Sequence, residues 1–127
     1  MIRVMTRVIL RIEGLFIFLL SVSAFIRLDG NWLLFILLLI LPDLSMLGYL
    51  KDSRTGAYIY NSVHNFVLAL LVTAVGYFLN FQLLLFAGIV LSAHIGLDRA
   101  FGFGLKEIKG FTQTHLGEIQ RRRRPHR

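Results

Sequence analysis

The 127-residue chain contains no cysteine, which excludes disulfides, thiolate catalysis and cysteine-ligated zinc or iron–sulfur sites. It is also poor in charge: Asp, Glu, Lys and Arg make up 17% of the residues, against about 25% in soluble domains. The sequence shows no serine or cysteine nucleophile motif, no phosphate-binding glycine loop and no dinucleotide fingerprint. These absences argue against a disulfide scaffold, a thiol enzyme and a nucleotide-binding domain.

Apolar residues are present in excess, at 56% of the chain, and they fall into four long runs. A helix needs about 20 such residues to cross a bilayer. The runs therefore predict an all-α fold, a polytopic membrane protein with a bundle of four transmembrane helices and a short cytoplasmic C-terminal tail. We expect one membrane domain over residues 1–127, with helices at about 4–26, 32–50, 56–78 and 83–105 and the basic tail at 106–127.

Lysine and arginine alternate between the two sides of this bundle. Three arginines precede the first run, and Lys51 and Arg54 lie between the second and third, whereas the other two loops hold only Arg27. The remaining positive charge follows the fourth run. Because cytoplasmic loops collect Lys and Arg, we expect a multi-pass membrane protein with both termini cytoplasmic. A cleavable signal peptide is the alternative interpretation of the first run.

Ionisable residues interrupt the apolar runs at similar depth. Asp43, His64, His94 and Asp98 all lie about 10–17 Å from the predicted cytoplasmic ends, at 1.5 Å per helical residue. Such residues are costly in a membrane and mark functional sites. The alternative is a structural layer in which these groups hydrogen-bond across helices and determine the packing. The sequence predicts a polar layer in the inner half of the bilayer.

The spacing of these residues suggests roles for them. His94 and Asp98 are four residues apart and share a helix face, as do Asn61 and His64, three residues apart. Imidazole and carboxylate groups suit Zn, Mn or Fe. The candidate metal ligands are His64, His94, Asp98 and His115. The candidate catalytic residues are Asp43 and Asp98, and the candidate substrate-binding residues are Asn61, Arg99 and Lys106.

Four motifs carry a resemblance to a known family: PDLSMLGY at 42–49, GAYIYNSVH at 56–64, AHIGLDRAFGFGLK at 93–106 and FTQTHLG at 111–117. With these motifs the chain resembles an uncharacterised bacterial family of small integral membrane proteins, the domain of unknown function 4260. The resemblance implies a four-helix membrane protein of bacterial source, and hence a location in the bacterial inner (cytoplasmic) membrane. It implies no activity.

Four arginines at residues 121–124 give the tail a polybasic cluster. Such a cluster beside a membrane helix binds anionic lipid. We expect no nucleic-acid binding, because no aromatic interleaving or folded basic module accompanies the arginines. The expected partner is the lipid bilayer.

The polar layer is compatible with several functions. The first is a metal-dependent hydrolase or transferase acting on a membrane-associated substrate. The second is a proton- or ion-linked small carrier, which at this size would need a homo-oligomer. The third is haem ligation by His64 and His94. The last is a structural or assembly protein without catalysis, so whether the chain is an enzyme stays open at this stage.

Overall fold

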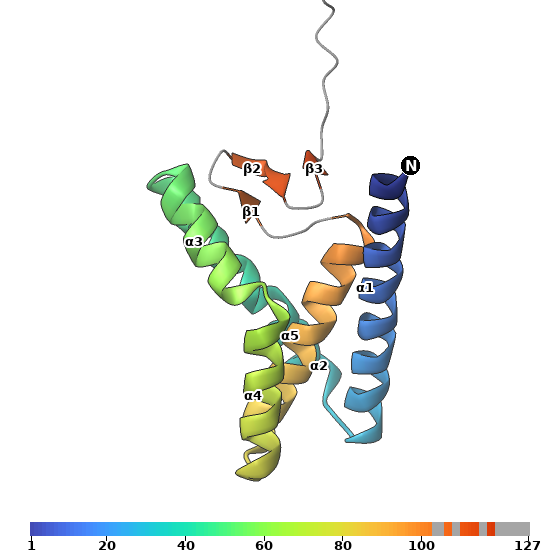
Figure 1. Cartoon of the computed structure of the whole chain (residues 1–127). Coiled ribbons are helices and arrows are strands. Elements are labelled where there is room, and N and C mark those ends of the chain that lie inside the picture. Colours follow the sequence, from blue (N-terminus) through green and yellow to red (C-terminus); the bar gives the residue numbers. More distant parts are fainter. Residues whose placement is uncertain (103–105, 108–109, 115–116, 119–127) are drawn as a thin grey trace, which may run out of the picture.

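The computed structural model describes residues 1–102, 106–107, 110–114 and 117–118 of the chain. Its helices are α1 (Ile2–Arg27), α2 (Trp32–Ile40), the 3₁₀ helix η1 (Leu41–Leu50), α3 (Ser53–Val63), α4 (Phe66–Phe78) and α5 (Gln82–Ala100) (Figure 1). They form four segments long and apolar enough to cross a membrane: α1, α2 with η1, α3 with α4, and α5. The predicted four-helix membrane fold is confirmed.

The first and fourth spans are uninterrupted helices that pack closely against each other. They approach at Gly14 and Gly96, where a Cβ atom on either residue would lie 2.6 Å from the carbonyl oxygen of the other. Only glycine permits so short a distance between the two backbones, as at many helix contacts in membranes. The α1–α5 pair is the most closely packed contact between the described helices.

The second span changes its helical form halfway, where α2 passes into η1 at Leu41. Pro42 follows, and a proline has no N–H to donate and clashes with the preceding turn of an α-helix. A 3₁₀ helix of ten residues is long for this conformation, which is seldom sustained beyond three or four. The proline that the sequence places here therefore begins a different helical form over the second half of the span.

The third span, expected as one helix over residues 56–78, is broken in two. α3 ends at Val63, and His64 leaves the helical conformation with φ −96° and ψ 51°. Asn65 then caps α4, because its side-chain oxygen accepts a hydrogen bond of 2.9 Å from the amide of Leu68. Asparagine is among the preferred residues for this capping position.

The fourth helix ends earlier than the sequence pattern suggests. α5 stops at Ala100, five residues before the expected end near residue 105. Gly102 has φ 92°, in the left-handed region that ends many helices. The chain therefore leaves the helical conformation at this glycine.

An aromatic cluster holds the end of the bundle away from the N-terminus. The buried ring of Phe25 lies 5.0–5.8 Å from the ring centres of Trp32, Phe35 and Phe86. These rings come from α1, α2 and α5, so one cluster joins three spans. Each side chain of this size contributes substantially to a core, and aromatic pairs add to that through ring geometry. This cluster packs three spans together at the end of the bundle away from the N-terminus.

Three short strands follow the last helix: β1 (Lys106–Glu107), β2 (Gly110–Thr114) and β3 (Gly117–Glu118). They pair antiparallel in the order β1-β2-β3. The strands lie near the N-terminal end of α1 and beside α3 (Figure 1). The sequence pattern predicted a tail without strands, so this small sheet is an addition to the expected fold.

Candidate metal centre

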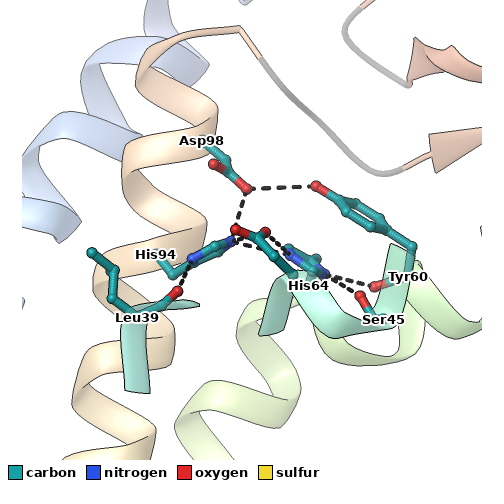
Figure 2. A network of polar contacts seen from close by, with 7 residues as sticks. Leu39, Ser45, Tyr60, His64, His94 and Asp98 are labelled. Carbon is teal, nitrogen blue, oxygen red and sulfur yellow. Dashed lines mark hydrogen bonds and ion pairs between the residues drawn. The ribbon is translucent and has the colours of Figure 1, made fainter. Parts of the chain in front are cut away.

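Four of the predicted polar residues meet at one point between the second, third and fourth spans (Figure 2). The Nε2 atoms of His64 and His94 lie 3.2 Å apart. Asp43 Oδ1 lies 3.2 Å from His94 Nε2 and 3.7 Å from His64 Nε2. Asp98 Oδ2 lies 3.2 Å from the same His94 nitrogen. Two imidazoles and two carboxylates therefore direct their ligand atoms toward a common space.

The orientation of His94 follows from the proline in the second span. His94 Nδ1 lies 2.6 Å from the carbonyl oxygen of Leu39. In a 3₁₀ helix that carbonyl would accept from residue 42, which is proline and has no N–H. A carbonyl only accepts, so Nδ1 of His94 carries a hydrogen and donates it to Leu39.

The break in the third span orients His64 in the same way. Its Nδ1 lies 3.0 Å from the carbonyl oxygen of Tyr60, to which it donates, and 3.3 Å from Ser45 Oγ. The Tyr60 ring stacks on the imidazole, with ring centres 3.7 Å apart and an angle of 5° between the planes. Both histidines are buried, with exposed fractions of 4% and 6%. Their rings are held in place by the surrounding helices.

These hydrogen bonds determine what the centre can bind. When both rings are neutral and Nδ1 of each donates to a backbone carbonyl, each Nε2 presents a lone pair. Two lone pairs and two carboxylates at these distances repel one another unless a cation or a proton lies among them. Metal-ligating histidines usually donate their second ring nitrogen in this manner, which fixes the tautomer. The arrangement has the ligand orientation of a metal site.

The separations fit a four-coordinate ion. Ligands at 2.0–2.1 Å from zinc in a tetrahedron stand about 3.3 Å from one another. The observed separations among Asp43, His64 and His94 are 3.2, 3.2 and 3.7 Å, and these three are a group whose ligand atoms lie within 4.8 Å of one another. The three residues can hold one metal ion without rearrangement.

Asp98 occupies the edge of this group. Its Oδ2 contacts His94 and also accepts a hydrogen bond of 3.5 Å from the Tyr60 hydroxyl. The side chains of Asp43 and Asp98 are 51% and 26% exposed, whereas both histidines are buried. The centre is therefore closed on the histidine side and open on the carboxylate side.

Among the other predicted site residues, Arg99 and Asn61 make contacts of their own. Arg99 stacks over the ring of Phe66 at 4.3 Å, with Glu13 as its electrostatic partner. The carbonyl of Asn61 accepts a 2.8 Å hydrogen bond from the Asn65 side chain. Lys106 is in β1, at the end of the chain where only backbone is described, and His115 lies outside the described residues.

Sequence reasoning missed the groups that orient the histidines: Ser45, the Tyr60 carbonyl and the Leu39 carbonyl. Backbone carbonyls leave no side-chain signal, and Leu39 looks like any residue of an apolar run. The one indication was Pro42, three residues after Leu39, because a proline frees a carbonyl on the preceding turn. A histidine at matching depth on another span could then have been paired with it.

The family model described as domain of unknown function (DUF4260) matches residues 7–119. The chain belongs to this family. The match spans all four membrane segments and every described residue of the metal centre, and it confirms the resemblance found in the sequence motifs. No curated protein and no solved structure shows detectable similarity to the chain. The family match assigns no activity, so function has to be argued from the centre itself.

Proposed function

We propose that this member of DUF4260 binds one divalent metal ion through Asp43, His64 and His94, and uses it as a hydrolase or transferase on a membrane-associated substrate. One observation supports this above the others. Both histidines donate Nδ1–H to backbone carbonyls, so both Nε2 lone pairs converge beside carboxylate oxygens. A purely structural pair would more simply hydrogen-bond nitrogen to nitrogen through opposite tautomers.

The open side of the centre supports catalysis rather than storage of an ion. Three protein ligands leave a fourth position free, as in catalytic zinc sites. A metal ion there supplies a Lewis acid and lowers the pKa of water. Asp98 lies at the edge of the group, held by the Tyr60 hydroxyl, where its carboxylate would accept the proton of an attacking water.

The ligand set selects the kind of ion. Two imidazoles with carboxylate suit Zn, Mn or Fe, whereas Mg and Ca prefer oxygen ligands alone. Haem ligation fits less well, because two axial imidazoles lie on opposite faces of a flat macrocycle. Here both nitrogens and the carboxylate oxygens converge on one point instead.

We further propose that the centre lies in the cytoplasmic half of the bundle, with the chain ends and the basic tail, bound to anionic lipid, on that side. The basic residues at the N-terminus and in the loop at Lys51 support this orientation. The chain lacks cysteine, so single Ser53→Cys and Gln82→Cys variants can be labelled in intact cells with an impermeant maleimide. We expect labelling at Gln82→Cys only; the reverse pattern would overturn the orientation.

Elemental analysis tests the metal proposal. The protein is purified in mild detergent without chelator beside a His64→Ala/His94→Ala variant and an Asp29→Asn control, whose carboxylate lies in the loop between the first two spans. We expect near-stoichiometric Zn, Mn or Fe in the parent and control, and none in the double variant. The proposal is overturned if none of the three proteins contains metal and if added metal or chelator does not change their stability. The cluster would then be a packing or proton-binding layer.

A further inference from the structure

A cavity of about 480 Å³ lies beside the metal centre, within the range of small-molecule sites. Its walls come from the second, third and fourth spans and include Leu41, Ile59, Val72, Ala87 and Leu91. Every wall residue is apolar except Ser45. A cavity of this composition does not hold ordered water, so its natural contents are hydrocarbon.

The cavity and the metal centre share a wall. Ser45, the one polar residue of the lining, places its Oγ 3.3 Å from Nδ1 of His64. Pro42 lines the cavity while the next residue, Asp43, points its carboxylate to the histidines. Both sites are thus formed in part by η1, the 3₁₀ helix that begins next to the proline.

The surroundings of the cavity restrict what can fill it. Val72 and Ala87 lie well inside segments that are long and apolar enough to cross a membrane. At that depth the molecules in contact with the protein are lipids, and their chains are as apolar as leucine. Asp43 directly follows the wall residue Pro42, and its half-exposed carboxylate leaves the centre accessible next to the cavity.

We propose that this cavity holds the hydrocarbon chain of a lipid-type substrate whose polar head reaches the His/Asp centre. The substrate class is therefore a membrane amphiphile with one chain in the cavity, not a water-soluble molecule. This inference rests on the proposed metal centre for its reactive part, but chain binding is measured separately. It gives the proposed enzyme a reason to place its ligands inside the bilayer.

A photoreactive fatty acid with a mid-chain diazirine tests the inference. The purified protein is labelled in mixed micelles, and the modified peptides are mapped by mass spectrometry. Ala87→Phe fills the cavity from α5, and Leu71→Phe adds the same ring on the exposed face of α4 as a control. We expect labels concentrated on cavity residues, reduced about tenfold by Ala87→Phe, a loss of about 1.4 kcal/mol in binding, and unchanged by Leu71→Phe.

Val72→Phe fills the same cavity from α4. If Ala87→Phe fails to fold, the loss of cavity labelling is measured on Val72→Phe instead. Labels spread evenly over the lipid-facing helices, and indifferent to both filling variants, would overturn the inference. Metal content is measured on the same samples. Metal without cavity labelling refutes the chain site alone, whereas cavity labelling without metal refutes the metal centre and leaves the chain site standing.

Discussion

The uninterrupted spans and the interrupted spans differ in what they contribute to the molecule. α1 and α5 run without a break and pack backbone to backbone at Gly14 and Gly96. The second and third spans change conformation partway along, and each change lies within two residues of a predicted site residue: Leu41 precedes Asp43, predicted as catalytic, and α3 ends just before His64, predicted as a metal ligand. The breaks therefore mark the site.

The physical reason is the backbone. A carbonyl without a partner is expensive inside a bilayer, so irregular segments persist only where other groups satisfy them. The second-span break frees the Leu39 carbonyl, which accepts from Nδ1 of His94, whereas the Tyr60 carbonyl at the third-span break accepts from both the backbone amide and Nδ1 of His64. The interrupted spans thus orient both histidines, while the continuous α5 holds His94 and Asp98 one turn apart.

The largest effect is expected where the continuous helix enters the centre. His94→Leu removes the nitrogen that contacts Asp43, His64 and Asp98, and should lower metal affinity more than 100-fold, beyond the 10–100-fold loss typical of supporting residues. Ser92→Ala, on the same helix, removes only a hydroxyl bonded to the Gly88 carbonyl. Competition with a fluorescent chelator measures both variants. Equal affinities would show that α5 supplies no ligand.

The close contact between the continuous spans is the next target. Gly14→Val would place a side chain against the Gly96 carbonyl, and overpacking of this kind lowers the free energy of unfolding by about 1–3 kcal/mol. Leu20→Phe, on the exposed face of α1, should change it little. Unfolding in mixed micelles measures both. A Gly14→Val protein as stable as the parent would contradict the close α1–α5 packing.

The next comparison is between two helix caps: that of α4, which lies at the break in the third span, and that of α3, which lies at the start of that span. Asn65→Ala removes the cap of α4 beside His64, and should lower stability by about 1 kcal/mol and metal affinity about tenfold, as for other supporting residues. Asp52→Ala removes the cap of α3, in which a side-chain oxygen of Asp52 accepts a hydrogen bond of 2.6 Å from the Thr55 amide. We expect metal affinity to fall for Asn65→Ala only. If both variants lost metal affinity, the loss could not be attributed to the break at His64.

The smallest expected effect is on the titration of Asp52, the exposed residue that caps α3. Hydrogen bonds from the Thr55 amide and hydroxyl lower the pKa of the Asp52 carboxyl. A group with a lowered folded-state pKa contributes stability above its unfolded value of about 3.9, and this is lost as the pH falls through the folded pKa. The Thr55 amide resonance should therefore titrate with a midpoint below 3.9. A midpoint above 3.9 would contradict the cap.

Much of this architecture could be predicted from the sequence. Bilayer thickness determines the length of each apolar run, and Asp43, His64 and His94 stand out because ionisable residues are costly inside a membrane. The depth argument placed these residues, with Asp98, in one layer, and the structure brings the four together. Periodicity alone says little about conformation within an apolar run. The periodicity predicted one helix for the third span, although Asn65 within it is a residue type that favours helix caps.

The details of the centre depend on contacts between distant segments. Arg99, expected at the substrate, stacks on the ring of Phe66, a contact in which the face of an aromatic ring attracts a cation. The role of the Leu39 carbonyl depends on a proline three residues later and a histidine 55 residues away. No local pattern in the sequence encodes such a pair.

X-ray absorption on the metal-loaded protein tests the central claim most directly, because it reports the atoms around the ion. The account predicts a four-coordinate ion with two imidazoles at about 2.0–2.1 Å, and loss of one imidazole shell in His94→Leu loaded at high metal concentration. Six oxygen ligands without imidazole scattering in the parent would contradict it, since the convergence of the two Nε2 atoms would then serve no metal.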